Sequence, residues 1–155
     1  MKFEKFVKSL ASTGTIYNCK NGDRWLASQS VFMLIPPTIR SITAAEIADM
    51  PEYIEKIITG IGHTDPATLI AAYMPIPDGG IKDCQREFAN KTGEIRCKIA
   101  NDDYSLIEKS DLLEIKYSFD IDDSEYKAKA LLVKTYPVVP DEDDELVGII
   151  FPIII

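Results

Sequence analysis

The side chains that most often carry enzyme chemistry are few in this sequence. His63 is the one histidine, and it lies in a Gly-His-Thr-Asp-Pro segment with no serine or cysteine that a motif places as its nucleophile. A catalytic triad or a zinc site needs at least one further partner of that kind. We therefore predict that the protein is not an enzyme, that it binds no zinc, and that His63 is a loop residue.

The three cysteines are Cys19, Cys84 and Cys97. Their number is odd, and their spacing matches neither a disulfide framework nor a Cys-x-x-Cys metal site. This pattern is typical of reduced, buried cysteines in a cytoplasmic protein. We expect no metal and no cofactor.

Two clusters of carboxylates have part of the composition of a cation site. Residues 120–125 have the beginning of a calcium loop, but Glu125 stands where glycine is needed and Leu131 stands where the last glutamate ligand belongs. Residues 141–145 are five adjacent acidic residues, which repel one another and stay in water. We predict a hairpin turn at the first cluster and a solvated loop at the second.

Composition indicates one globular domain. The chain has 155 residues, of which 46% are hydrophobic and 27% charged, enough for a contiguous core. The net charge of −8 argues against attraction of the whole molecule to nucleic acid or anionic lipid. Charge is uneven, since residues 1–43 are net positive and residues 101–145 strongly acidic. Its apolar runs are shorter than the ~18 residues of a membrane helix, and no signal peptide is evident. We expect a cytoplasmic protein without membrane contact.

Apolar spacing in the first part of the chain predicts a short helix, three strands and a further helical segment. Asn21-Gly22 is the turn pair typical of a hairpin, and Pro36-Pro37 ends the third strand because proline donates no ladder hydrogen bond. Thr43 and Glu46 have the spacing of a helix capping box. The predicted elements are a helix over 3–10, strands over 15–19, 24–28 and 31–35, and helical residues over 44–60.

The remainder of the chain predicts one more helix among several hairpins. Ile81, Cys84 and Phe88 share one helical face, and Lys82 and Arg86 share the other. The predicted elements are a strand over 68–76, a helix over 81–90, and strands over 94–99, 104–108, 112–120, 126–136 and 146–154.

A weak internal repeat relates the two parts. Residues 16–20 and the Asn-Gly-Asp that follows them parallel residues 95–98 and the Asn-Asp-Asp at 101–103. Halves of about 1–60 and 68–155 then each contain a helix and a hairpin. The repeat predicts an α+β single domain whose helix-hairpin unit occurs twice, with both helices on one face of antiparallel sheet. The expected core residues are Leu10, Ile16, Leu34, Ile57, Phe88, Ile95, Leu106, Ile115, Leu132 and Ile150.

Two stretches resemble bacterial DNA polymerase sliding clamps. The first stretch is residues 88–96, Phe-Ala-Asn-Lys-Thr-Gly-Glu-Ile-Arg, which precede Asn101-Asp102-Asp103. It is similar to the place in the clamps where a strand with the pattern Gly-Glu-x-Leu enters a turn with the sequence Asp-Gly-His-Arg-Leu. Residues 146–153 are similar to the closing strand of a clamp domain, which ends in a Met-Pro-Met-like sequence. The chain departs from the clamps at that turn, where it has Asp102-Asp103-Tyr104.

The resemblance implies a DNA-clamp-like fold and a non-catalytic role linked to DNA replication or to a mobile element. Clamp chains have three such domains and close as dimers, so this chain would have to self-associate to enclose DNA. Helices that line a clamp present cations to phosphates. The candidate DNA-facing residues are Lys2, Lys5, Lys8, Lys82 and Arg86.

Candidate partner-binding residues lie on the first hairpin and near the end of the sequence. Tyr17 and Trp25 can anchor a protein or stack on bases if they face solvent, and they belong to the core if they do not. Phe151, Pro152 and Ile153 either complete a sheet or contact another molecule, because exposed apolar edges favour association.

Three classes of function remain, and each has its own structural sign. A clamp-like binding protein requires cations gathered on a helical face. A generic protein-interaction or regulatory module is favoured by an apolar groove without such a basic face. A small enzyme requires perturbed carboxylates that converge in a pocket.

Overall fold

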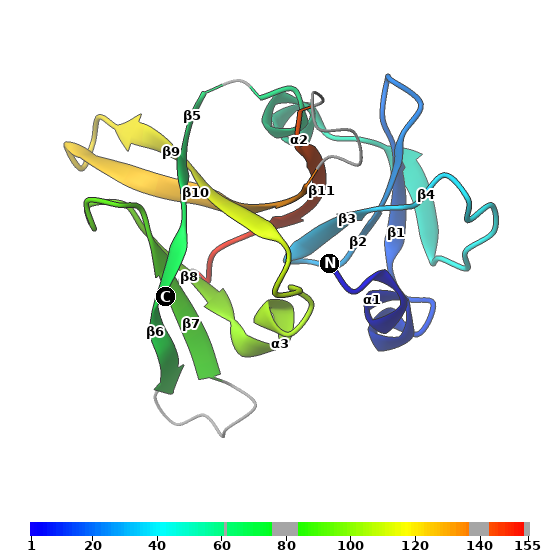
Figure 1. Cartoon of the computed structure of the whole chain (residues 1–155). Coiled ribbons are helices and arrows are strands. Elements are labelled where there is room, and N and C mark those ends of the chain that lie inside the picture. The colour runs from blue at the N-terminus through cyan, green and yellow to red at the C-terminus, as the bar shows by residue number, and fades with distance from the viewer. Residues whose placement is uncertain (61, 76–83, 137–142, 154–155) are drawn as a thin grey trace.

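The computed structural model describes residues 1–60, 62–75, 84–136 and 143–153, with the backbone alone at 71–75 and 84 (Figure 1). Its larger sheet has eight strands, in the order β4 (Glu46–Asp49), β1 (Thr15–Asn18), β2 (Arg24–Ala27), β3 (Val31–Leu34), β11 (Glu145–Ile150), β10 (Glu125–Thr135), β9 (Leu112–Asp120) and β5 (His63–Pro66). The smaller sheet is β6 (Thr68–Pro75), β7 (Cys84–Ala89) and β8 (Arg96–Ala100). The helices within the described residues are α1 (Phe3–Leu10), α2 (Glu52–Ile58) and α3 (Asn101–Tyr104).

The central strands of the larger sheet are buried on both faces. In β2, Leu26 packs into one core cluster, and its neighbours Trp25 and Ala27 pack into the other. Because successive side chains of a strand point to opposite faces, these clusters lie on the two sides of the sheet. Phe6 of α1 belongs to the first cluster, and Ile54 of α2 belongs to the second. The two helices therefore cover opposite faces.

The predicted fold class is wrong. The chain is mostly β, with about 45% strand and 14% helix, and its helices do not share one face of the sheet. The predicted repeat does not form either. Strands β1 and β2 make a hairpin, whereas β8 pairs with the preceding β7 and runs on into the single turn of α3. A clamp-like arrangement of two helix-hairpin units is not present.

Two segments predicted as helical contain strands, and one segment predicted as a strand forms the end of a helix and a turn. Residues 84–89 form β7, and residues 81–83 lie outside the described part. Cys84 and Phe88 share a side in a strand as well as in a helix, so their spacing did not separate the two. Residues 46–49 form β4, which pairs in parallel with β1, and the helix begins only after Pro51. Residues 104–108, predicted as a strand, contain the end of α3 and a turn.

The other expected elements are confirmed. Helix α1, strands β1, β2 and β3, strand β6 and the β9–β10 hairpin lie where the sequence predicts them, and residues 121–124 form the turn of that hairpin. The expected core residues are buried except Leu10 and Leu34, which are half-buried. His63 is not in a loop but begins β5. None of the helices in the described part has the length and apolar composition needed to cross a bilayer.

The last described residues connect the two sheets. The backbone N–H of Phe151 donates to the Ser30 carbonyl oxygen over 2.8 Å, and that of Ile153 donates to the Lys98 carbonyl oxygen over 2.8 Å. Ser30 precedes β3 of the larger sheet, whereas Lys98 is in β8 of the smaller one. Of the two alternatives for this segment, the structure therefore shows contact within the chain.

The burial of β10 gives a prediction about stability. Leu131 is fully buried at the middle of that strand. The substitution Leu131→Ala should lower the free energy of unfolding by about 2–5 kcal/mol, because it removes buried methyl groups and leaves a cavity. Ile47→Ala is the control, since Ile47 is 69% exposed, and it should change stability by less than about 0.5 kcal/mol. Urea denaturation measures both; equal effects would contradict the burial of β10.

Candidate functional groove

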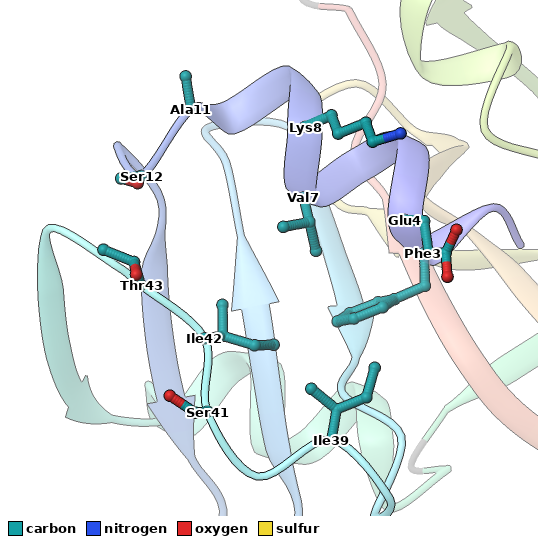
Figure 2. Close-up of a pocket in the computed structure, with 10 residues that line it drawn as sticks. All are labelled: Phe3, Glu4, Val7, Lys8, Ala11, Ser12, Ile39, Ser41, Ile42 and Thr43. Atoms are coloured by element: carbon teal, nitrogen blue, oxygen red, sulfur yellow. The ribbon is translucent and has the colours of Figure 1, made fainter.

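An apolar groove of about 410 Å³ lies between α1 and residues 39–43 (Figure 2). Phe3 and Val7 are four residues apart, so they share one side of α1. Figure 2 shows both side chains directed toward Ile39 and Ile42 of the facing segment. We call this site, lined by apolar side chains from both walls, the α1 groove.

The helix wall is fixed by burial on its other side. Phe6 is 2% exposed and packs into the core cluster of the larger sheet, which holds α1 against it. At the end of the helix, Ala11 (φ 46°) and Ser12 (φ 70°) both adopt left-handed backbone conformations, and both line the groove. Such conformations cost non-glycine residues about 1–2 kcal/mol each, so the surrounding structure must enforce them.

The opposite wall is held by three hydrogen bonds. The Arg24 guanidinium donates to the Ile39 carbonyl oxygen over 2.7 Å, and the Ile39 N–H donates to the Pro36 carbonyl oxygen over 2.9 Å. The Ala45 N–H donates to the Gly14 carbonyl oxygen over 2.9 Å, joining this segment to the chain that leaves α1. The apolar side chains of both walls are therefore presented by fixed backbone.

The rim of the α1 groove is polar and exposed. It carries Glu4 and Lys8 from the helix and the hydroxyl groups of Ser12, Ser41 and Thr43. One acidic and one basic side chain give the rim no net charge of either sign. The site is thus defined by its apolar lining rather than by a charge.

The predicted DNA-facing cations do not form a two-helix basic face. Lys2, Lys5 and Lys8 are exposed at α1, and the Lys5 ammonium donates to the Ser105 carbonyl oxygen over 3.4 Å. Arg86 lies on a strand; its Nε donates to Asn101 Oδ1 over 3.0 Å, and its guanidinium lies 4.6 Å from the centre of the Tyr104 ring. Lys82 lies outside the described residues.

The candidate partner-binding residues make contacts within the chain. Trp25 is 1% exposed, so its indole is a core group and not a surface anchor. The ring of Phe32 stacks on Tyr17 with centroids 5.4 Å apart and meets Phe151 edge-on at 5.7 Å. Pro152 and Ile153 are half-buried beside β8.

The groups with nucleophilic or metal-binding chemistry lie elsewhere. Burial raises the pKa of Cys97 to about 12 and, together with nearby Glu55 and Asp23, that of Cys19 to about 11, so both are thiols at neutral pH. Nothing is described of the Cys84 side chain. Among the described residues, no group of three or more His, Cys, Asp or Glu side chains is placed to hold a metal ion.

The pKa of the Asp103 carboxyl is raised by its surroundings. Asp103 lines a cavity of about 460 Å³ between α1, α3 and the β2–β3 turn. Burial raises the pKa of its carboxyl, a hydrogen bond with Ser30 opposes this shift, and the charge of Asp102 adds to it. Its Oδ2 is a buried atom without a hydrogen-bond partner among the described residues. Asp120, whose pKa is lowered, does not line this cavity, so the carboxyls with shifted pKa values do not form the convergent set that acid–base catalysis requires.

Sequence reasoning missed the second wall of the groove. The sequence predicts the helix over 3–10 that carries Phe3 and Val7, but it gives no element or role to Ile39 and Ile42. The available signal was two isoleucines in an otherwise polar segment after Pro36-Pro37, where no strand or helix accounts for apolar residues.

Comparison with known proteins found no matching family model, no matching curated protein and no matching solved structure. The sliding-clamp resemblance therefore rests on the two sequence stretches alone, and the α1 groove is interpreted from its own geometry.

The environment of Asp103 predicts a pH-dependent stability. Folding raises the pKa of the Asp103 carboxyl, so ionisation of this group at neutral pH lowers the free energy of unfolding. This destabilisation decreases as the pH falls below the folded-state pKa, and it is absent below the ordinary pKa of an aspartate. Asp103→Asn should therefore raise the melting temperature by a few degrees at pH 7, and the difference from the wild type should vanish near pH 4.

Asp102→Asn is the matched control, because it removes the same charge from an exposed neighbour. Thermal melts from pH 4 to pH 8 measure both variants. A wild type more stable than Asp103→Asn at pH 7 would show that the buried carboxylate is stabilising.

Proposed function

We propose that this protein is a non-catalytic interaction module that binds an apolar segment of a partner protein in the α1 groove. The observation that carries the proposal is the pair of apolar walls. Helix α1 is held by Phe6 in the core of the larger sheet, and residues 39–43 are held by the hydrogen bond from Arg24 of β2 to Ile39. An apolar groove without a two-helix basic face favours the interaction module over the clamp.

A protein segment fits the groove better than a small polar ligand does. Small-molecule sites combine apolar lining with a few convergent polar groups that fix the ligand's orientation. Here the polar groups are exposed at the rim, and none of the buried side-chain atoms that lack partners belongs to the lining. Apolar anchors of a peptide need shape and burial instead.

The expected affinity follows from the few anchors that the groove can hold. Each buried leucine-sized side chain contributes about 1.5–3 kcal/mol, and association costs at least ~4 kcal/mol in lost freedom. Three anchors at the upper value then leave at most ~5 kcal/mol, which corresponds to a dissociation constant of about 0.2 mM or weaker. Binding of this strength is reversible and suits a transient contact.

Peptide selection tests the proposal. A display library of random 16-residue peptides is first depleted on Ile42→Asp and then selected on the wild-type protein. Enriched sequences should carry at least two apolar anchors. In fluorescence anisotropy, Ile42→Asp should weaken binding of the enriched synthetic peptide at least tenfold, because it places a carboxylate in the apolar wall.

The matched control is Ile47→Asp, the same change at an isoleucine on β4 that does not line the groove. It should leave affinity unchanged. Because Ile42 is half-buried, Phe3→Ala serves as a second groove variant, and thermal melts show that each variant is folded. Absence of enrichment, or equal binding by folded groove variants, would refute the proposal.

A further inference from the structure

Four aromatic rings form a continuous row across β5, β9 and β10. His63 is the register partner of Tyr117, and Phe119 is the register partner of Tyr126. The ring centroids are 5.7 Å apart for His63 and Tyr117, 5.7 Å for Tyr117 and Tyr126, and 5.2 Å for Tyr126 and Phe119. We call these four residues the aromatic row.

The outer part of the row is exposed. Phe119 is 52% exposed and Tyr126 is 53% exposed, and both lie toward the tip of the β9–β10 hairpin, which extends beyond β5 (Figure 1). Ile121 in the turn is 81% exposed. Apolar groups that cluster at one exposed place indicate an interaction site more strongly than the same groups scattered singly.

The rings are not arranged as a flat stack. Tyr117 and Tyr126 are nearly perpendicular, at 86°, and Tyr126 and Phe119 meet at 68°. Inclined rings present both faces and edges to a ligand beside them. The π faces carry negative charge density and attract a cation within about 6 Å.

The surroundings of the row are rich in carboxylates. Asp65 accepts hydrogen bonds from the Tyr117 hydroxyl over 3.4 Å and from Asn90 Nδ2 over 3.0 Å. The end of the β9–β10 hairpin, just after Phe119, carries four more carboxylates within six residues. They are Asp120, Asp122, Asp123 and Glu125.

Three cations beside the hairpin are paired with carboxylates. Lys127 forms ion pairs with Asp123 and, over 3.5 Å, with Asp120. Arg96 and Lys98 on β8 both pair with Glu87, over 3.1 Å and 3.6 Å. A cleft of about 510 Å³ between the hairpin and β8 is lined by Tyr126 and by three cations and three carboxylates, which are Arg96, Lys98, Lys127, Glu87, Glu94 and Glu125. The charges of the cleft balance, so the excess negative charge lies at the end of the hairpin, residues 120–125.

We propose that the aromatic row and the acidic end of the β9–β10 hairpin bind an arginine-rich segment of a partner protein. Guanidinium groups stack on aromatic faces and pair with carboxylates in the same contact, and they do so better than the more strongly hydrated lysine ammonium. The acidic hairpin attracts such a segment and repels phosphates. This surface is built from other residues than the α1 groove, and its ligand has the opposite chemistry.

A fluorescein-labelled peptide of six Gly-Arg repeats tests the proposal, with Gly-Lys and Gly-Glu peptides of the same length beside it. At ~150 mM salt, anisotropy should show the arginine peptide binding more tightly than the lysine peptide, and no binding of the glutamate peptide. Phe119→Leu and Tyr126→Leu keep an apolar side chain and the net charge but remove the π face. Each should raise the dissociation constant threefold to tenfold.

The matched control is Tyr53→Leu, because Tyr53 is 63% exposed on α2 and outside the row. It should bind the arginine peptide like the wild type. Leucine variants that bind like the wild type would overturn the proposal, since net charge alone would then explain the affinity. Tighter binding of a labelled oligothymidine, or self-association that the leucine variants abolish, would also overturn it by identifying a different occupant.

Discussion

Burial of the central strands on both faces is the constraint on which the rest of the structure depends. Strand β10 places Leu131 and Val133 in one core cluster and Ala130 and Leu132 in the other. A sheet that is apolar on both sides needs cover on both sides. Helix α2 covers one face, while α1 and the β7–β8 part of the smaller sheet contribute to the other. The α1 groove exists because Phe6 of the helix packs into the core, whereas Phe3 and Val7 lie beside residues 39–43.

The position of α1 is reinforced by the residues just before it. The Lys2 N–H donates to the Leu106 carbonyl oxygen over 2.8 Å, and the Met1 ammonium pairs with Asp111 over 2.9 Å. A Cβ at Gly148 of β11 would collide with the Met1 thioether, so a larger residue there would require the Met1 side chain to move. The start of the helix therefore contacts both the loop after α3 and the larger sheet. These contacts fix the position of α1, although the helix has only eight residues.

Local signals in the sequence were sufficient where one element decides its own structure. The stripe of α1, the Asn21-Gly22 turn and the long β9–β10 hairpin depend on residues close in sequence, and they were predicted. Strand β4 was missed because it forms by parallel pairing with β1, a contact that no neighbouring residue signals. Strand β7 was missed because it is covered on both sides, burying Gln85, Glu87 and Phe88 alike, and such a strand has no alternation to detect. The α1 groove was missed for a related reason, since it requires two segments to meet in space.

The fold places the net positive segment and the acidic segment of the chain at two different surfaces. The net positive residues 1–43 supply both walls of the α1 groove, and the acidic residues 101–145 supply three of the four rings of the aromatic row. Apolar contacts in the groove depend little on salt, whereas attraction of cations to the hairpin weakens as salt screens exposed charges. Ionic strength therefore acts on one surface and spares the other. A protein with two such surfaces can hold one partner through burial while its contact with a second is tuned by the ionic conditions.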